Sequence, residues 1–171
     1  VVALAIGTAK VIATAKDGNE VKAELEGVIT AAENTCANDF GKMKEIVDAY
    51  DFNRIVYLGA NCLKGIAQES QLKMLELTAG KVATMYDTPL GFRHGPKSII
   101  NDETLTVVYI SDDEYTRQYE VDLIKEMSAQ RKGNKIAAIM NKYDAEIAGL
   151  VDFAYACELD KAHDNAYLGF N

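Results

Sequence analysis

The sequence predicts an α/β domain with a doubly wound parallel sheet of five strands, flanked by helices and preceded by further helices. Three observations lead to this prediction. Between residues 54 and 153, short apolar runs alternate with longer segments whose apolar residues recur every three or four positions. The runs are apolar on both sides, as in parallel strands that helices cover on both faces. Glycines follow several of these segments, where the chain has to turn.

The elements are expected in the following order. A buried helix is predicted over residues 1–15, an amphipathic helix over 20–34, and a short helix that Asn38 and Asp39 cap and that runs to residue 50. Strands are predicted over residues 54–59, 82–86, 104–111, 135–140 and 147–153. Helices are predicted between them over residues 66–78, 96–101 and 114–131.

Composition and charge exclude several classes of function. A formal net charge of −8 and a pI near 4.8 argue against unaided binding to nucleic acid or to an anionic membrane. No apolar run reaches the ~18 residues of a membrane span, and no basic segment precedes the apolar start as in a secretory signal. Cys36, Cys62 and Cys157 are scattered, without metal-binding or disulfide spacing. We expect a cytoplasmic protein that uses no metal or other cofactor and binds a small molecule.

Two stretches carry candidate chemistry. In Arg93-His94-Gly95-Pro96 a titratable imidazole lies beside a permanent cation at the start of a short helix. On the helix upstream, Glu69, Lys73 and Glu76 recur at spacings of four and three and therefore share one face. Ligands of doubly wound sheets bind beyond the carboxyl ends of the strands. We therefore expect the loop after Gly59 and the His94 segment, both of which follow strands, to meet there.

These stretches resemble a sugar isomerase (SIS) domain. The motifs that carry the resemblance are Tyr57-Leu58-Gly59-Ala60-Asn61, Gln68-Glu69-Ser70-Gln71-Leu72-Lys73-Met74-Leu75-Glu76 and Phe92-Arg93-His94-Gly95-Pro96. The chain is most similar to the carboxyl-terminal SIS half of the tagatose-6-phosphate ketose/aldose isomerase group, some members of which act as amino-sugar phosphate deaminases. The resemblance implies that residues 1–50 are a helical linker or the end of a preceding SIS lobe, and that residues 51–171 are an SIS domain.

The resemblance also implies roles for single residues in a phosphosugar isomerase. Glu76 would shuttle a proton between C1 and C2 of the sugar, and His94 would open the sugar ring. In the related synthases the histidine is offered to the neighbouring subunit, which implies a homodimer. Lys73, Arg93, Asn61 and Glu69 are the remaining candidates, for substrate binding. The chemistry fits these residue types, because passage through an enediol needs a carboxylate base at the two carbons and an acid or base at the ring oxygen.

Two departures from the family pattern keep other interpretations open. The serine- and threonine-rich phosphate loop is absent, since the corresponding loop reads Ala60-Asn61-Cys62-Leu63, and no counterpart of the family's catalytic lysine tail follows Asp160. The chain therefore resembles part of a longer protein. One alternative is a phosphosugar-binding SIS domain that senses its ligand without converting it. Another is an incomplete structural lobe that is inert alone and needs its first half. For the single residues, Glu76 could also be a solvated surface acid and His94 a helix cap.

Overall fold

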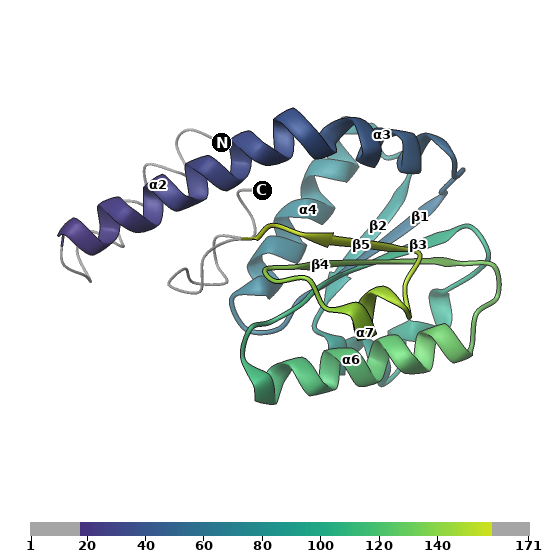
Figure 1. Ribbon diagram of the computed structural model, residues 1–171. Coiled ribbons are helices and arrows are strands. Elements are labelled where there is room, and N and C mark those ends of the chain that lie inside the picture. The colour runs from purple at the N-terminus through teal and green to yellow at the C-terminus, as the bar shows by residue number, and fades with distance from the viewer. Residues whose placement is uncertain (1–17, 159–171) are drawn as a thin grey trace.

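A computed structural model describes residues 18–158, and the helix expected over residues 1–15 lies outside this range. Five parallel strands form one sheet in the order β2-β1-β3-β4-β5. Their bounds are β1 (Arg54–Leu58), β2 (Ala83–Asp87), β3 (Thr104–Tyr109), β4 (Lys135–Met140) and β5 (Phe153–Ala156). The chain winds outward in both directions from β1 and β3, so the predicted doubly wound architecture is confirmed (Figure 1).

Helices cover both faces of this sheet. They are α2 (Gly18–Asn34), α3 (Phe40–Asp48), α4 (Leu63–Leu77), α5 (Pro89–Arg93), α6 (Glu114–Ala129) and α7 (Ala145–Ala148), with a π turn η1 (Thr35–Asp39) and a 3₁₀ turn η2 (Pro96–Ile99). Among the helices of residues 18–158, none combines the length and the apolar character that crossing a bilayer requires.

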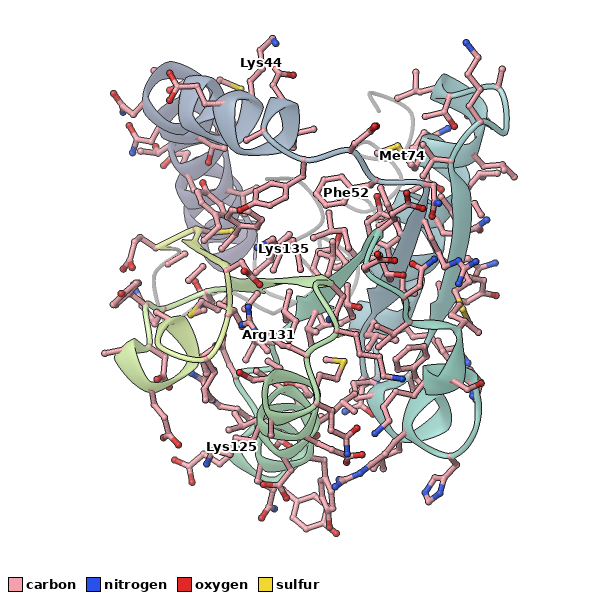
Figure 2. All side chains as sticks on the ribbon, turned by 90° about the vertical axis from the view of Figure 1, so that its right-hand side faces the viewer. Lys44, Phe52, Met74, Lys125, Arg131 and Lys135 are labelled. Atoms are coloured by element: carbon pink, nitrogen blue, oxygen red, sulfur yellow. The ribbon has the colours of Figure 1, made fainter. Side chains whose placement is uncertain are left out.

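Strand alternation divides the core into two layers. Ile55 and Tyr57 pack with buried residues of α2 and α4, whereas Val56 and Leu58 pack with Phe92 of α5 and the apolar face of α6. Successive side chains of a strand point to opposite faces of the sheet, so α4 and the α5–α6 pair lie on opposite sides. Figure 1 shows this three-layer arrangement, and in Figure 2 Phe52 and Met74 lie on one side and Lys125 on the other.

The amino-terminal helices differ from the prediction. Asn38 and Asp39 do not cap a new helix, because α2 runs on through the π turn into α3. Thr35, at the start of this turn, is buried and bonds to the Ala31 carbonyl and to the Tyr155 hydroxyl of β5. This hydrogen bond to the edge strand β5 stabilises the helical turn at residues 35–39, where the sequence pattern predicted the end of one helix and the start of another.

The last strand was predicted too early. The apolar run 147–153 was expected to be a strand, but Ile147 belongs to α7, where it is fully buried in the α6-side core. Asp144 caps this helix by accepting hydrogen bonds from the backbone N–H groups of Glu146 and Ile147. Periodicity alone cannot tell a short buried helix from a buried strand. The short helix α5 was also missed, although Thr88 and Pro89 form a standard helix start.

The chain passes closely between β1 and α4 at Gly59. A Cβ atom on Gly59 would lie 2.3 Å from the backbone oxygen and 2.5 Å from the backbone carbon of Leu63, the first residue of α4. Because these are backbone atoms, no side-chain rotation can relieve the clash. Gly59 therefore sets how α4, with its charged face, leaves the sheet.

We predict that Gly59→Ala lowers the free energy of unfolding by roughly 2–4 kcal/mol, as expected for a substitution that overpacks against the backbone. The matched control is Gly65→Ala inside α4, where a Cβ meets nothing within 4 Å. That variant should be neutral or more stable by up to about 1 kcal/mol, because alanine favours helix. Denaturant unfolding measures both, and equal stability of the two variants would contradict this account of the β1–α4 turn.

Candidate functional site

The charged face predicted on the upstream helix is present on α4. Lys73 Nζ lies 3.0 Å from Glu76 Oε2 and 3.5 Å from Glu69 Oε1. The hydrogen bond to Glu76, followed by the charges of both glutamates, raises the pKa of Lys73 above its ordinary value. Each of the three side chains is about half exposed. The face thus presents two carboxylates joined through one ammonium group.

Near its carboxyl end α4 also carries apolar side chains that are exposed in the structure. Leu72, Leu75 and Leu77 are exposed by 41%, 40% and 84%. The helix ends just beyond Glu76, where Gly80 takes a φ of +73° and its N–H bonds to the Leu75 carbonyl at 3.0 Å. The Glu76 side chain itself is 54% exposed, so the residues that the structure describes do not bury it.

The His94 segment is fixed to α6 through Glu126. Arg93 Nε lies 2.7 Å from Glu126 Oε2, and Lys97 Nζ pairs with the other carboxylate oxygen and donates to Gln130 Oε1 at 3.0 Å. The hydrogen bond from Lys97 and the pairing with Arg93 lower the pKa of Glu126. Both flanks of the His94-Gly95-Pro96 step are tied to one helix, while the His94 side chain remains exposed.

A cavity of about 540 Å³ opens beside His94. Arg93, Lys97 and Lys132 contribute positive charge to its lining. Ile100 and Asn134, which precede β3 and β4, also line it, so the cavity lies toward the amino ends of these strands. Asn61 instead lines a separate cavity with Glu120. The loop after Gly59 thus meets the start of α5, at residues 88–90, whereas His94 at the far end of α5 lines the other cavity.

Glu76 and His94 lie in different layers. Glu76 is on α4, which packs on one face of the sheet, and His94 follows α5, which packs on the other face. The chain brings together Glu69, Lys73 and Glu76, and it brings together Arg93 and His94, but it does not join the two groups. Among the described residues, no three histidine, cysteine, aspartate or glutamate side chains are grouped as a metal ion would require.

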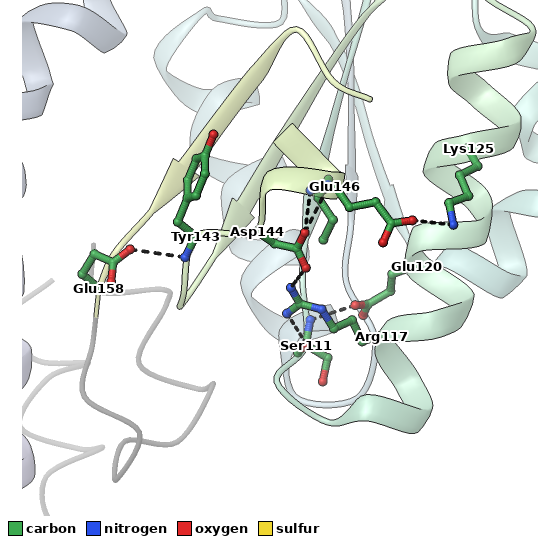
Figure 3. Close-up of polar contacts among 9 residues, drawn as sticks. Ser111, Arg117, Glu120, Lys125, Tyr143, Asp144, Glu146 and Glu158 are labelled. Atoms are coloured by element: carbon green, nitrogen blue, oxygen red, sulfur yellow. Dashed lines mark hydrogen bonds and ion pairs between the residues drawn. The ribbon is translucent and has the colours of Figure 1, made fainter. Parts of the chain in front are cut away.

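Glu120 is a residue that sequence reasoning missed. It is fully buried, and its Oε2 accepts a hydrogen bond from the backbone N–H of Ser111 at 2.8 Å (Figure 3). Burial raises the pKa of Glu120 to about 7, although the Ser111 N–H and the Arg117 charge act in the opposite direction. Helical spacing in the sequence could have indicated that Glu120 is buried. It stands three, four and seven positions before the buried residues Leu123, Ile124 and Met127 of α6.

Comparison with known proteins identifies the family to which this chain belongs. The SIS domain model matches residues 49–163. The chain belongs to the SIS domain family. The resemblance drawn from the sequence motifs is thereby confirmed, and the match covers the whole five-stranded sheet together with α4, α5 and α6.

Individual relatives of this SIS domain carry names from phosphosugar metabolism. D-galactosamine-6-phosphate deaminase AgaS of Escherichia coli is 53% identical over 100 residues, which cover 58% of this chain and 26% of that protein. AgaS of Shewanella sp. (strain ANA-3) is 45% identical over 97 residues, or 57% of this chain and 25% of that protein. The chain thus spans about a quarter of the length of these curated relatives.

Solved structures agree with this SIS relationship. The crystal structure of tagatose-6-phosphate ketose/aldose isomerase from Escherichia coli has a TM-score of 0.73 with this chain and is 38% identical to it. The similarity covers 84% of this chain and 38% of that one. The architecture described above is therefore shared with this group of SIS proteins.

We predict that Glu120→Gln stabilises the SIS domain at pH 8 and changes its stability by less than about 1 kcal/mol at pH 5. The folded carboxyl has a pKa of about 7, above the ordinary 4.5. Between these values the unfolded chain releases a proton that the folded chain keeps, so this group's contribution to stability falls as the pH rises. At about 1.4 kcal/mol per pKa unit, the variant should gain up to about 3 kcal/mol at pH 8.

Urea unfolding at the two pH values measures this effect. The control is Glu114→Gln, which changes an exposed glutamate in the first turn of the same helix and should have a similar small effect at both pH values. An effect of Glu120→Gln that does not grow between pH 5 and pH 8 would contradict the assignment of a buried, proton-binding carboxyl.

Proposed function

We propose that this chain is the carboxyl-terminal SIS part of a phosphosugar aldose/ketose isomerase of the tagatose-6-phosphate or galactosamine-6-phosphate isomerase/deaminase type. The observation that carries the proposal is the Glu69–Lys73–Glu76 face of α4, in a chain that is 53% identical over 100 residues to a D-galactosamine-6-phosphate deaminase. On this proposal residues 1–50 join the SIS domain to a preceding lobe, and the enzyme works in the cytoplasm.

The proposed chemistry is a proton transfer between neighbouring carbons. In an open-chain aldose, the Glu76 carboxylate removes the proton from C2, which gives an enediol, or an enolamine from a 2-amino sugar. From a ketose such as tagatose 6-phosphate it removes a proton from C1, and the same steps run in reverse. Return of the proton to C1 gives the ketose, or an imine that water hydrolyses with release of ammonia. Lys73, 3.0 Å from Glu76, holds the carboxylate in place and can donate to the oxygen on which negative charge develops.

His94 is proposed to open the sugar ring by exchanging a proton with the ring oxygen. An imidazole titrates near pH ~6.5 and can both give and take a proton at neutral pH. Because His94 and Glu76 lie in opposite layers of the chain, we assign the two residues of one site to different subunits of a homodimer. The exposed Leu72, Leu75 and Leu77 support this assignment, since a partner that covers them would also bury Glu76.

Substrate binding is proposed for the polar residues around these two groups. Arg93 and Lys73 are cations beside His94 and Glu76, and Glu69 holds Lys73 from the other side. Asn61 stands at the carboxyl end of β1, but its loop, Ala60-Asn61-Cys62, offers no serine or threonine hydroxyl to a phosphate. We therefore assign the phosphate-binding loop to a part of the protein outside this SIS domain.

We predict that Glu76→Gln in the full-length protein lowers kcat for tagatose 6-phosphate or galactosamine 6-phosphate by about 100- to 10,000-fold, with little change in KM, because only the proton transfer is lost. Glu114→Gln serves as the control, because its side chain is exposed on α6, in the opposite layer. Turnover by Glu76→Gln at the wild-type rate would contradict the proposal. Binding of both phosphosugars by the wild type without turnover would favour the sensor alternative.

A further inference from the structure

The His94-Gly95 step has few contacts of its own to hold it in place. The His94 side chain is exposed and forms no hydrogen bond or ion pair within residues 18–158, while its backbone N–H bonds to the Gly91 carbonyl at 3.3 Å. A Cβ atom on Gly95 would meet nothing within 4 Å, so neighbouring atoms do not wedge the backbone there. The position of the imidazole therefore depends on the residues at its two flanks.

The flanks of this step are attached to α6. Phe92 is fully buried and packs in the core with the apolar face of that helix. Arg93 Nε lies 2.7 Å from Glu126 Oε2, and Lys97 Nζ pairs with Glu126 Oε1. Of the described residues that pair with these two cations, Glu126 is the one that pairs with both. One carboxylate thus links the residue before the histidine to the lysine three positions after it.

The two oxygens of the Glu126 carboxylate are used separately, one for each cation. A glutamine at this position could not reproduce the arrangement, because an amide has one acceptor oxygen and would turn its NH₂ group toward the second cation. An aspartate would retain both acceptor oxygens and the charge on a side chain that is one methylene shorter. The bridge therefore depends on a carboxylate and not only on a polar side chain of this size.

The charges around the histidine make this bridge important. Arg93, Lys97 and Lys132 all line the cavity of about 540 Å³, and none of the described residues that line it is an acid. The side chains of the bridge are only 20–35% exposed, so water and salt screen their charges in part. Without the carboxylate the cations would repel one another across the step. The hydrogen bond from Lys97 and the charges of both partners lower the pKa of Glu126, so the bridge persists where an imidazole titrates.

We propose that Glu126 is a positioning residue, which keeps the His94 imidazole at the ring oxygen of the sugar. It acts through its ion pairs with Arg93 and Lys97 and touches no substrate itself. The inference rests on the proposed function, because it requires that His94 opens the sugar ring. On the shared-site assignment, Glu126 serves the site that contains the partner subunit's Glu76.

The first test is steady-state kinetics of the full-length protein with galactosamine 6-phosphate or tagatose 6-phosphate. Glu126→Gln should lower kcat by about 10- to 100-fold and change KM by less than about threefold, because a displaced acid–base group slows the chemical step more than binding. Glu126→Asp keeps the charge and both oxygens, so its kcat should exceed that of Glu126→Gln by at least about fivefold.

The matched control is Asp144→Asn. It removes the carboxylate of another α6 ion pair, with Arg117 at 2.7 Å and a similar exposure, and asparagine can still cap α7. Asp144→Asn should keep the wild-type kcat, whatever it does to stability. Denaturant unfolding of each variant is measured alongside, and a kcat that falls in both variants in step with stability would reduce Glu126 to a structural role and overturn the inference.

Subunit mixing then assigns the defect to one half of the site. Mixed dimers of Glu126→Gln with Glu76→Gln should regain one wild-type site, whereas mixed dimers of Glu126→Gln with His94→Ala should regain none. The reference is the mixture of Glu76→Gln with His94→Ala. If that reference does not recover, the shared site is wrong and the kinetic comparison alone decides on Glu126.

Three results would overturn the positioning role while leaving the proposed function intact. They are a wild-type kcat in Glu126→Gln, a kcat in Glu126→Asp no higher than in Glu126→Gln, and a Glu126→Gln defect that His94→Ala subunits repair and Glu76→Gln subunits do not. Undiminished turnover by His94→Ala would be a different failure, since it would remove the proposed role of the histidine and the inference with it.

Discussion

Coverage of the parallel sheet on both faces is the constraint on which the rest of this SIS domain depends. Strands such as β1 bury side chains on both sides, so the crossover helices must be shared between the two faces. α4 is assigned to one face and α5 with α6 to the other. This separation places Glu76 and His94 on opposite sides of the sheet. On our proposal it is the reason why a site that uses both residues requires two subunits.

Much of the fold follows from sequence pattern, but the arrangement in space does not. β4 begins and ends at the predicted residues 135 and 140, and the shared face of Glu69, Lys73 and Glu76 follows directly from helical spacing. The prediction of a strand at Ile147 was wrong because a short apolar run fits a buried helix equally well. The separation of Glu76 from His94 depends on which face each helix takes, and that choice is set by strand order and crossover direction rather than by local sequence.

The domain positions the two proposed catalytic residues through ion pairs and helix placement. Lys73 holds Glu76 at the end of α4, and Gly59 fixes how that helix leaves the sheet. Glu126 ties both flanks of the His94 step to α6. Glu120 shows the opposite situation, a buried acid whose second oxygen has no hydrogen-bond partner within residues 18–158. Such unsatisfied groups stand out against a well-packed background.

The central claim, that Glu76 of one subunit works with His94 of its partner, is tested most directly by subunit complementation. Full-length Glu76→Gln and His94→Ala proteins, each inactive alone, are dissociated, mixed in equal amounts and reassociated. Half of the dimers are then mixed, and each mixed dimer holds one intact site, so the account predicts recovery of about a quarter of wild-type activity. Activity that stays at the level of the separate variants, although mixed dimers form, would contradict a shared site.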